Sequence, residues 1–232
     1  EHFVINHIAV GKALLSEDEN KMGCITIDIG GGTCDIALYN RGALRQVFVV
    51  PLAGDDITND LAIGLKTTPT NAEYIKTQYG NANSANVSQE IEIEVEGISG
   101  RSAQKKSQYL ISQIIQRRVE EILSDCYQVS ISKYIPELVT AGIVLSGGTA
   151  NLKGIESLVS EAFNMNVKTS CPDLSSVTGM ISRLEDPAYA TVIGLLYHAR
   201  YLNMDGTGTQ FSIPKMKDFK LFDKIKNLLK EI

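Results

Sequence analysis

Three consecutive glycines, Gly30–Gly32, separate two short apolar segments and constrain the fold more than any other feature of this chain. Residues 24–29 (CITIDI) alternate and are rich in β-branched side chains, and residues 34–39 (CDIALY) are similar, so both are predicted to be strands. A turn at 40–42 leads to residues 43–50, which predict a third strand. Glycines between two strands allow a ligand to approach the backbone, and consecutive backbone amides can bind phosphate oxygens.

The side chains beside these glycines favour a phosphate-binding loop over a plain hairpin. Asp28 ends the first predicted strand, and Thr33 and Asp35 lie at the start of the second. A carboxylate at the position of Asp28 can hold Mg²⁺ through water, because Mg²⁺ keeps most of its waters. The segment fits neither the P-loop nor the Rossmann fingerprint. A glycine-rich hairpin without a ligand is the structural alternative.

Two further motifs are weak on their own. Residues 142–150 (GIVLSGGTA) predict a strand that enters a glycine turn, where the backbone could lie against an adenine ring or a phosphate; the turn residues are Gly147, Gly148 and Thr149. Glu73 and Lys76 lie three residues apart on one face of a predicted helix, where they could contact a ribose and a base. Taken singly, an ordinary strand-to-helix turn and a solvated ion pair explain them better.

The remaining pattern predicts an α/β chain. We expect helices over residues 3–15, 56–66, 70–79 (capped by Thr70 or Asn71), 101–135, 155–163 and from near Pro187 to 202. Further strands are expected over residues 91–97 and 167–171, with polar connections at 16–20 and 80–90.

Composition excludes several classes of protein. The 232 residues carry a net charge of -5, with no long basic stripe before the tail and no Trp, so we expect no nucleic-acid partner. No apolar run approaches the length of a membrane-spanning helix. The four cysteines form no CxxC pair, so we expect neither a metal site nor a disulfide framework, and reduced thiols are the simplest interpretation.

The last segment predicts an amphipathic helix over residues 211–232, after a flexible linker at 203–210. Its apolar residues share one helical face, with lysines elsewhere around the helix: Leu221, Phe222, Ile225, Leu228, Leu229 and Ile232. A tethered, Lys-rich helix of this kind indicates binding to a membrane surface containing anionic lipids. Docking on the chain's own core is the alternative.

Together the motifs are more specific than any one of them. The order DxGGGTxD, ExxK and G[IV][VIL]L[ST]GG resembles the second half of the actin-like ATPase superfamily. Residues 17–80, 141–150 and 185–199, with the terminal helix, resemble the FtsA family of bacterial cell-division proteins. The resemblance covers nearly the whole chain.

The resemblance implies an α/β, actin-like ATPase (ribonuclease H-like) fold with an inserted small α+β subdomain. It divides the chain into residues 1–55 with 140–202, which carry the nucleotide loops, and the inserted residues 56–139. ATP and Mg²⁺ are the implied cofactors, with Mg²⁺ held only through the nucleotide. The implied roles are catalytic for Asp28, phosphate loop for Gly30, Gly31, Gly32 and Thr33, ribose and base contact for Glu73 and Lys76, and adenosine loop for Gly147, Gly148 and Thr149.

One departure from the superfamily pattern limits these expectations. The first phosphate loop, of DxGT type, is absent, and the chain begins at Glu1 rather than Met. We therefore expect this chain to correspond to the C-terminal half of an FtsA-like protein. Alone it should bind ATP weakly or not at all and be at most a weak ATPase.

The resemblance also implies partners. In the FtsA family the inserted subdomain receives the C-terminal peptide of the tubulin-like protein FtsZ. Here apolar and charged residues on the predicted 101–135 helix would offer that contact: Ile114, Ile115, Arg117, Arg118, Glu120 and Glu121. A solvated helix face is an equal alternative for any single one of them.

The expected function is an adaptor that tethers FtsZ filaments to the cytoplasmic face of the cell membrane at the division septum, with self-assembly and other division proteins as partners. An actin-like ATPase acting as an enzyme, and a PilM-type pilus-assembly protein, are the alternatives. The terminal helix argues against the PilM type.

Overall fold

A computed structural model describes residues 3–130, 139–179 and 181–204. The chain divides into two compact units, residues 1–197 and residues 198–232, and the fold below is that of the first. The predicted terminal helix with its six apolar residues, and the linker beyond residue 204, lie outside the described residues. Across the described ranges, the helices all lack the length or the hydropathy needed to cross a membrane.

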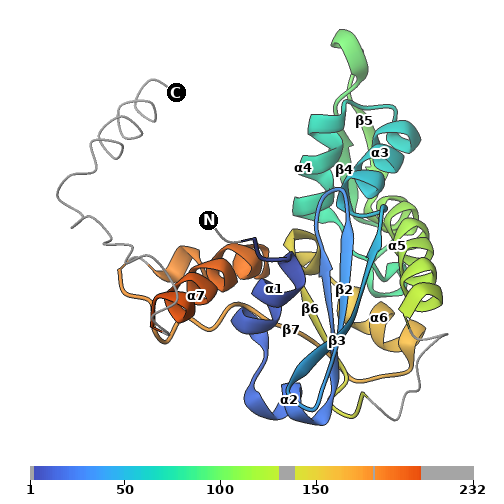
Figure 1. Cartoon of the computed structure of the whole chain (residues 1–232). Coiled ribbons are helices and arrows are strands. Elements are labelled where there is room, and N and C mark those ends of the chain that lie inside the picture. Colours follow the sequence, from blue (N-terminus) through green and yellow to red (C-terminus); the bar gives the residue numbers. More distant parts are fainter. Residues whose placement is uncertain (1–2, 131–138, 180, 205–232) are drawn as a thin grey trace. The chain divides into compact units, whose positions relative to one another are not determined.

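A five-stranded sheet is the centre of the fold (Figure 1). Its strands, in spatial order, are β3 (Ala43–Val50), β2 (Cys34–Asn40), β1 (Cys24–Ile29), β6 (Ile143–Ser146) and β7 (Val167–Thr169). The β1–β2 and β2–β3 pairs are antiparallel, whereas β1–β6 and β6–β7 are parallel. The meander predicted from the sequence therefore supplies three of the strands. Strand β6, which carries the second glycine motif, pairs directly with β1, which leads into the first glycine motif.

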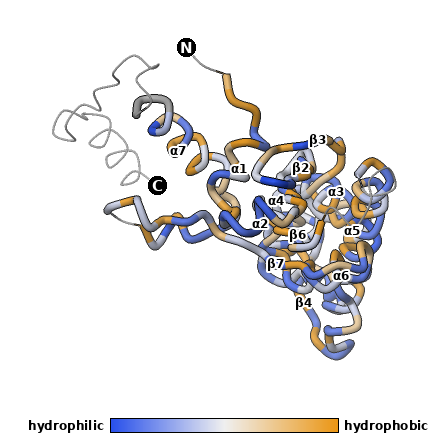
Figure 2. The backbone as a smooth tube through the Cα atoms, turned by 60° about the horizontal axis from the view of Figure 1, so that its bottom comes forward, coloured by the Kyte–Doolittle hydropathy of each residue, from blue (hydrophilic) through white to orange (hydrophobic). Residues whose placement is uncertain are grey.

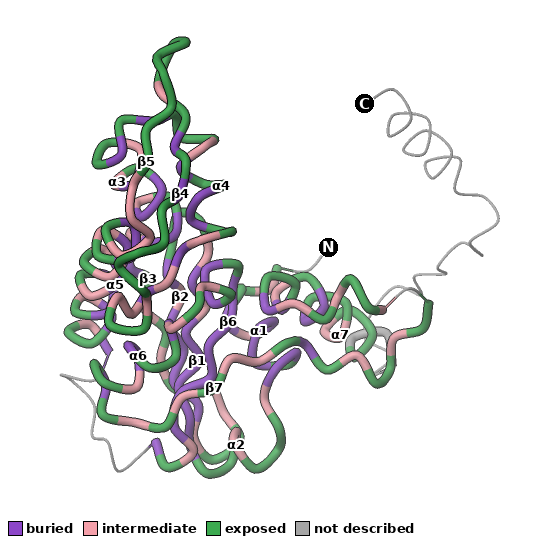
Figure 3. The backbone as a smooth tube through the Cα atoms, turned by 180° about the vertical axis from the view of Figure 1, so that it is seen from behind, coloured by how far each residue is buried: buried purple, intermediate pink, exposed green. Residues whose placement is uncertain are grey.

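Alternation along the strands gives the sheet two buried faces. In β1, Ile25, Ile27 and Ile29 lie in one apolar cluster with residues of α5 (Gln108–Ser130) and α6 (Ile155–Phe163). The intervening residues of β1 and its neighbours point to the other face, where α1 (Asn6–Leu14) packs. There the Tyr39 hydroxyl donates a hydrogen bond of 2.6 Å to the His7 carbonyl. β6 is buried along its length and β1 is buried except at Asp28, which is of intermediate burial (Figure 3).

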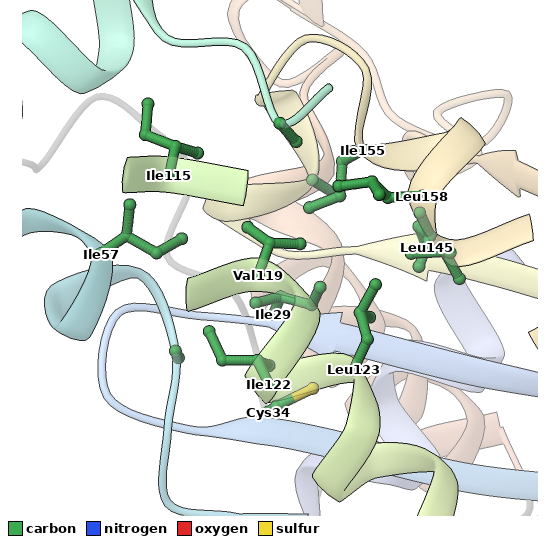
Figure 4. Packing of buried hydrophobic residues seen from close by; sticks show 14 of the residues in the cluster. Ile29, Cys34, Ile57, Ile115, Val119, Ile122, Leu123, Leu145, Ile155 and Leu158 are labelled. Atoms are coloured by element: carbon green, nitrogen blue, oxygen red, sulfur yellow. The ribbon is translucent and has the colours of Figure 1, made fainter. Parts of the chain in front are cut away.

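Helix α5 carries the largest buried stripe of the molecule. Its apolar residues recur at helical spacing, face the sheet and α3, and are buried: Ile111, Ile115, Val119, Ile122, Leu123 and Cys126. Figure 4 shows Ile115, Val119, Ile122 and Leu123 among them. Apolar and polar residues alternate along α5 in Figure 2, as expected of an amphipathic helix.

A second group of elements lies beyond the ends of β1 and β2 (Figure 1). It contains α3 (Gly54–Leu65), α4 (Pro69–Tyr79) and a two-stranded sheet of β4 (Glu92–Val95) and β5 (Gln104–Ser107). One apolar cluster joins residues of α3, α4 and α5 to the central sheet. The division at residues 56 and 139 implied by the resemblance stays a prediction.

The described chain is completed by short turns and one further helix. The 3₁₀ turns are η1 (Ser84–Asn86), η2 (Ile98–Gly100), η5 (Gly148–Asn151), η6 (Ile181–Arg183) and η7 (Pro187–Tyr189). Helix α7 (Ala190–Met204) follows η7 and packs against α1 so closely that a Cβ on Gly194 would overlap the Ala9 carbonyl.

Three predictions about the elements are wrong in detail. Residues 104–107 are a strand rather than the start of the 101–135 helix, because they pair with β4 and place Lys105 Nζ 3.0 Å from Glu92 Oε2. The cap of α4 is Thr68, whose hydroxyl accepts from the Asn71 amide, with Pro69 as the first helical residue. Residues Glu17–Met22 form a short helix, α2, rather than a connection.

A capping box in the sequence predicts the start of α2. Ser16 and Glu19 form a capping box, in which the Ser16 hydroxyl accepts from the Glu19 amide and the Glu19 carboxylate accepts from the Ser16 amide. The spacing S-x-x-E is the usual signature of that device.

Candidate functional site

A cavity of about 400 Å³ opens where the glycine motifs meet α3 and α4. Its lining comes from four segments that are distant in sequence: Gly30, Gly31, Gly54, Asp55, Glu73, Lys76, Thr77, Gly80, Gly148, Thr149, Asn151, Leu152 and Lys153. Six of the ten residues predicted for catalysis and nucleotide binding therefore lie together: Gly30, Gly31, Glu73, Lys76, Gly148 and Thr149. Asp28, Gly32, Thr33 and Gly147 are not part of the lining.

The glycine loop between β1 and β2 is held by the start of α3. The Gly30 amide donates to the Thr33 carbonyl at 3.0 Å and closes the turn. The first two amides of α3, at Gly54 and Asp55, donate to the carbonyls of Gly30 and Gly31 at 3.1 and 2.8 Å. These amides have no partner within the helix, so the loop satisfies donors that a helix start leaves free.

Gly54 is required where α3 meets the second glycine motif. A Cβ at this position would lie 2.5 Å from Thr149 Oγ1 and 3.0 Å from the Gly30 carbonyl oxygen. The Thr149 hydroxyl donates to the same carbonyl at 2.9 Å. Gly54 therefore allows the loop, the helix and the second motif to meet on one side of the cavity.

Lys76 forms the polar floor of the cavity with residues of α3. Its side chain is buried, and Nζ donates to the Gly54 carbonyl at 2.9 Å and to the Thr58 hydroxyl at 2.8 Å. Nζ also lies 2.7 Å from Glu73 Oε2, and the Thr58 hydroxyl donates to that carboxylate. The sequence alone favours a solvated ion pair for Glu73 and Lys76, but in the structure the lysine is buried and has three partners.

The same contacts set the charge of Glu73. Partial burial acts to raise the pKa of Glu73, but the hydrogen bonds from Lys76 and Thr58 and the lysine charge outweigh it, so the pKa lies below its ordinary value. The carboxylate is therefore ionised at neutral pH and can accept hydrogen bonds from a ligand.

The turn after β6 contains two glycines with different requirements. Gly147 has φ of +87°, and a Cβ there would lie 2.6 Å from Asp28 Oδ1 and closer still to the Ile29 carbonyl oxygen. Gly148 has no such constraint, because the nearest atom to its Cβ would be the Ala188 methyl at 4.0 Å. Gly32 in the first loop is also unconstrained, since a Cβ there would meet nothing within 4 Å.

Asp28 lies between Ile27 and Ile29 in β1, so its side chain points to the α1 face of the sheet, and it does not line the cavity. It is opposite Asp35 in the β1–β2 pair, and Asp28 Oδ2 is 3.4 Å from Ser146 Oγ. Burial first, and then the charge of Asp35, raise the pKa of Asp28 to about 6. His7 Nε2 lies 3.7 Å from Asp35 Oδ1 in the same cluster. The catalytic role of Asp28 stays a prediction.

No cluster of three metal-ligating side chains occurs within the described ranges. That magnesium is held only through a bound nucleotide stays a prediction.

Sequence analysis did not predict several of the residues that line the cavity. They are Gly54, Asp55, Thr77, Gly80, Asn151, Leu152 and Lys153. A signal existed for the first two, because a glycine followed by two aspartates at a predicted helix start is typical of an N-terminus that meets another backbone. Asn151 and Lys153 had no local signal.

The predicted partner residues lie on a second, shallower surface. A groove of about 490 Å³ runs between α3 and α5 and is lined by Asp60, Ile63, Gly64, Gln113, Ile114 and Arg117. Here it is called the α3–α5 groove. Ile63, which lines the groove, is 77% exposed and offers an apolar side chain to a partner.

Not all of the predicted partner residues line this groove. Arg118 forms two hydrogen bonds with Asp60, of 2.7 and 2.9 Å, and one of 2.8 Å with Glu121. Ile115 is fully buried, so it supports the core rather than a surface. Ile114 and Arg117 are the predicted residues that reach the groove itself.

Comparison with known proteins agrees with this architecture. The family model described as "Cell division protein FtsA" matches residues 25–194. Cell division protein FtsA of Neisseria meningitidis is 37% identical over 200 residues, which cover 86% of this chain and 48% of that protein. FtsA of Bacillus subtilis is 36% identical over 209 residues, covering 90% of this chain and 46% of that protein. The chain thus spans about half the length of these curated relatives.

Solved structures share the actin-like fold. MreB5 of Spiroplasma citri bound to ADP has a TM-score of 0.70 at 18% identity, covering 89% of this chain and 62% of that one. A type IV pilus biogenesis complex of PilM and PilN has a TM-score of 0.63 at 19% identity, covering 85% of this chain and 52% of that chain. The fold alone does not separate these proteins, whereas the family model does.

Proposed function

Because the chain belongs to the FtsA family of cell-division proteins, we propose that it forms the part of a division adaptor that binds a nucleotide at the glycine-lined cavity and the FtsZ C-terminal peptide at the α3–α5 groove. The match of the FtsA family model to residues 25–194 carries the proposal. The cavity and the α3–α5 groove are the surfaces to which the proposal assigns these two ligands.

The chemistry of the cavity supports ATP as its ligand. Gly30, Gly31 and Gly148 would place backbone against phosphate groups. Among the described residues, the atom nearest to a Cβ at Gly148 would be the Ala188 methyl at 4.0 Å, so packing there does not demand glycine. Glu73, ionised and held by Lys76, would accept from ribose hydroxyls. A volume of about 400 Å³ is within the range of small-molecule sites. ATP with Mg²⁺ would supply an energy-rich phosphate, and turnover by this chain is expected to be weak at most.

Replacing Lys76 by Met tests the nucleotide part of the proposal. The variant loses the donor to the Gly54 carbonyl and the partner of Glu73, so we expect ATP affinity to fall about tenfold. Heteronuclear NMR titration with Mg–ATP suits weak binding, and amide shifts should cluster at Gly30, Gly31, Gly148 and Thr149.

Lys105→Met is the matched control. Lys105 is an exposed lysine on β5, paired with Glu92, and this variant should bind like the parent. Amide shifts scattered outside the cavity, or none in the parent chain, would refute nucleotide binding by this chain.

The α3–α5 groove fits a peptide that is both apolar and charged. Ile63 and Ile114 offer apolar contact, while Arg117, whose side chain is 86% exposed, and Asp60 offer charges of both signs. We propose that this surface receives the FtsZ peptide, with Arg118 and Glu121 fixing Asp60 at its edge.

Ile63→Glu should weaken the FtsZ peptide at least tenfold, because it replaces an exposed apolar contact with an unpaired charge. The measurement is fluorescence anisotropy with a labelled peptide of the FtsZ C terminus. Ile91→Glu, at another exposed apolar position that does not line the groove, should bind like the parent. Equal affinity of both variants and the parent would remove the groove from the proposal.

The remaining parts of the adaptor function rest on the family and on the sequence. We propose self-assembly, contact with other division proteins and a location at the septum on the cytoplasmic face of the membrane, with residues 211–232 binding anionic lipids. Co-sedimentation with anionic vesicles, with and without residues 211–232, tests the lipid contact.

A further inference from the structure

Two cysteines that are distant in sequence touch inside the core. Cys34 begins β2, immediately after the glycine loop, and Cys126 lies in the buried stripe of α5. Their Sγ atoms are 3.4 Å apart across 92 residues of sequence, and both side chains are fully buried. Figure 4 shows Cys34 beside Ile122 and Leu123 of α5.

Both sulfurs are held in place by rigid surroundings. Cys34 pairs with Ile29 on one side and Val50 on the other, so it lies inside the sheet rather than at a free end. Cys126 lies about one turn before the end of α5 at Ser130, in the same apolar cluster as Cys34. A disulfide needs an S–S distance of about 2.05 Å, so the two sulfurs must approach by about 1.4 Å.

We propose that Cys34 and Cys126 are a reversible oxidation site, at which a peroxide converts the two thiols to an intramolecular disulfide. One thiolate attacks the peroxide, its sulfur becomes a sulfenic acid, and one molecule of water is released. The second thiol attacks the sulfenic sulfur and the S–S bond forms. The sulfenic OH leaves with the hydrogen of the second thiol as a second molecule of water. The two electrons lost by the sulfurs reduce the peroxide.

The environment makes this reaction slow. The contact with Cys126 and burial both hold the pKa of Cys34 well above its ordinary value, so little thiolate exists at neutral pH. The pair therefore resists brief oxidation and responds to sustained exposure. The bond would tie the strand that follows the glycine loop to the helix that forms one side of the α3–α5 groove.

The other two cysteines serve as internal controls. Cys24 is buried on the opposite face of the sheet, in a cluster with Ala37 and Tyr39, and Cys171 is exposed. The test starts from the full chain carrying Cys171→Ser, which removes the exposed thiol. This protein is incubated with hydrogen peroxide, alkylated, digested without reduction and analysed by mass spectrometry.

We expect a peptide in which Cys34 and Cys126 are linked, absent from the Cys126→Ala variant and retained in the Cys24→Ala variant. Because the bond closes a long loop, the oxidised protein should melt about 5–15 °C higher, and dithiothreitol should reverse the shift. The proposal is overturned if both cysteines are still alkylated after unfolding of the treated protein. It is equally overturned if the linked peptide forms only in urea, because the folded arrangement would then play no part.

Discussion

Gly147→Ala is expected to lower the free energy of unfolding by about 3 kcal/mol, the largest loss we expect from any single methyl group added near the site. Gly147 has φ of +87°, which is unfavourable for a residue with a Cβ, and that Cβ would lie 2.6 Å from Asp28 Oδ1. Relief of this overlap requires movement of β1 or β6, which are paired in the centre of the sheet. Urea denaturation followed by circular dichroism measures the effect.

Gly148→Ala provides the comparison within the same turn. A Cβ at Gly148 would meet nothing closer than 4.0 Å, so its stability should change by less than about 0.5 kcal/mol. Under the nucleotide proposal, the same variant should weaken Mg–ATP, since Gly148 lines the cavity. Equal destabilisation by the two variants would show that the turn adapts to either side chain.

Asp28→Asn is expected to stabilise the protein by about 2–3 kcal/mol at pH 7. Burial, and then the charge of Asp35, raise the pKa of Asp28 to about 6, so the folded state disfavours the ionised carboxylate. Asn is neutral and has nearly the same shape, and its amide oxygen can still accept from Ser146. Thermal and urea denaturation at pH 7 measure the gain.

The raised pKa of Asp28 also predicts how the free energy of unfolding changes with pH. Between the pKa of the unfolded carboxyl, near 4, and about 6, folded Asp28 keeps a proton that the unfolded chain releases. The contribution of Asp28 to stability is therefore complete below that window and is lost as the pH rises through it. Asp28→Asn should lack this fall, whereas Asp18→Asn, at an exposed carboxylate of α2, should retain it. A parent chain whose stability is flat from pH 4 to 7 would contradict the assignment.

Local pattern was sufficient for the central strands and most helices. Residues 24–29, 34–39 and 43–50 are strands as predicted, because β-branched and apolar residues alternate there between glycine and polar turns. The actin-like fold and the FtsA family are also confirmed, since they rest on the order of several motifs.

What the sequence could not show depends on contacts between distant segments. Residues 104–107 are polar and indistinguishable from a helix start until β4 is present to pair with them. Ile115 has the same local surroundings as Ile114, yet only the packing of α5 on the sheet decides that Ile115 is buried. Likewise, the face to which Asp28 points follows from the register of β1 with β2.

The amides that α3 donates to the carbonyls of Gly30 and Gly31 determine when the glycine loop becomes ordered. The loop loses its conformational entropy during folding, together with the helix, and not when a ligand arrives. A binding site that is already rigid keeps more of its contact energy as affinity, because binding need not freeze a mobile loop. This preorganisation is the means by which a loop of three glycines, the most flexible residues available, can act as a fixed surface.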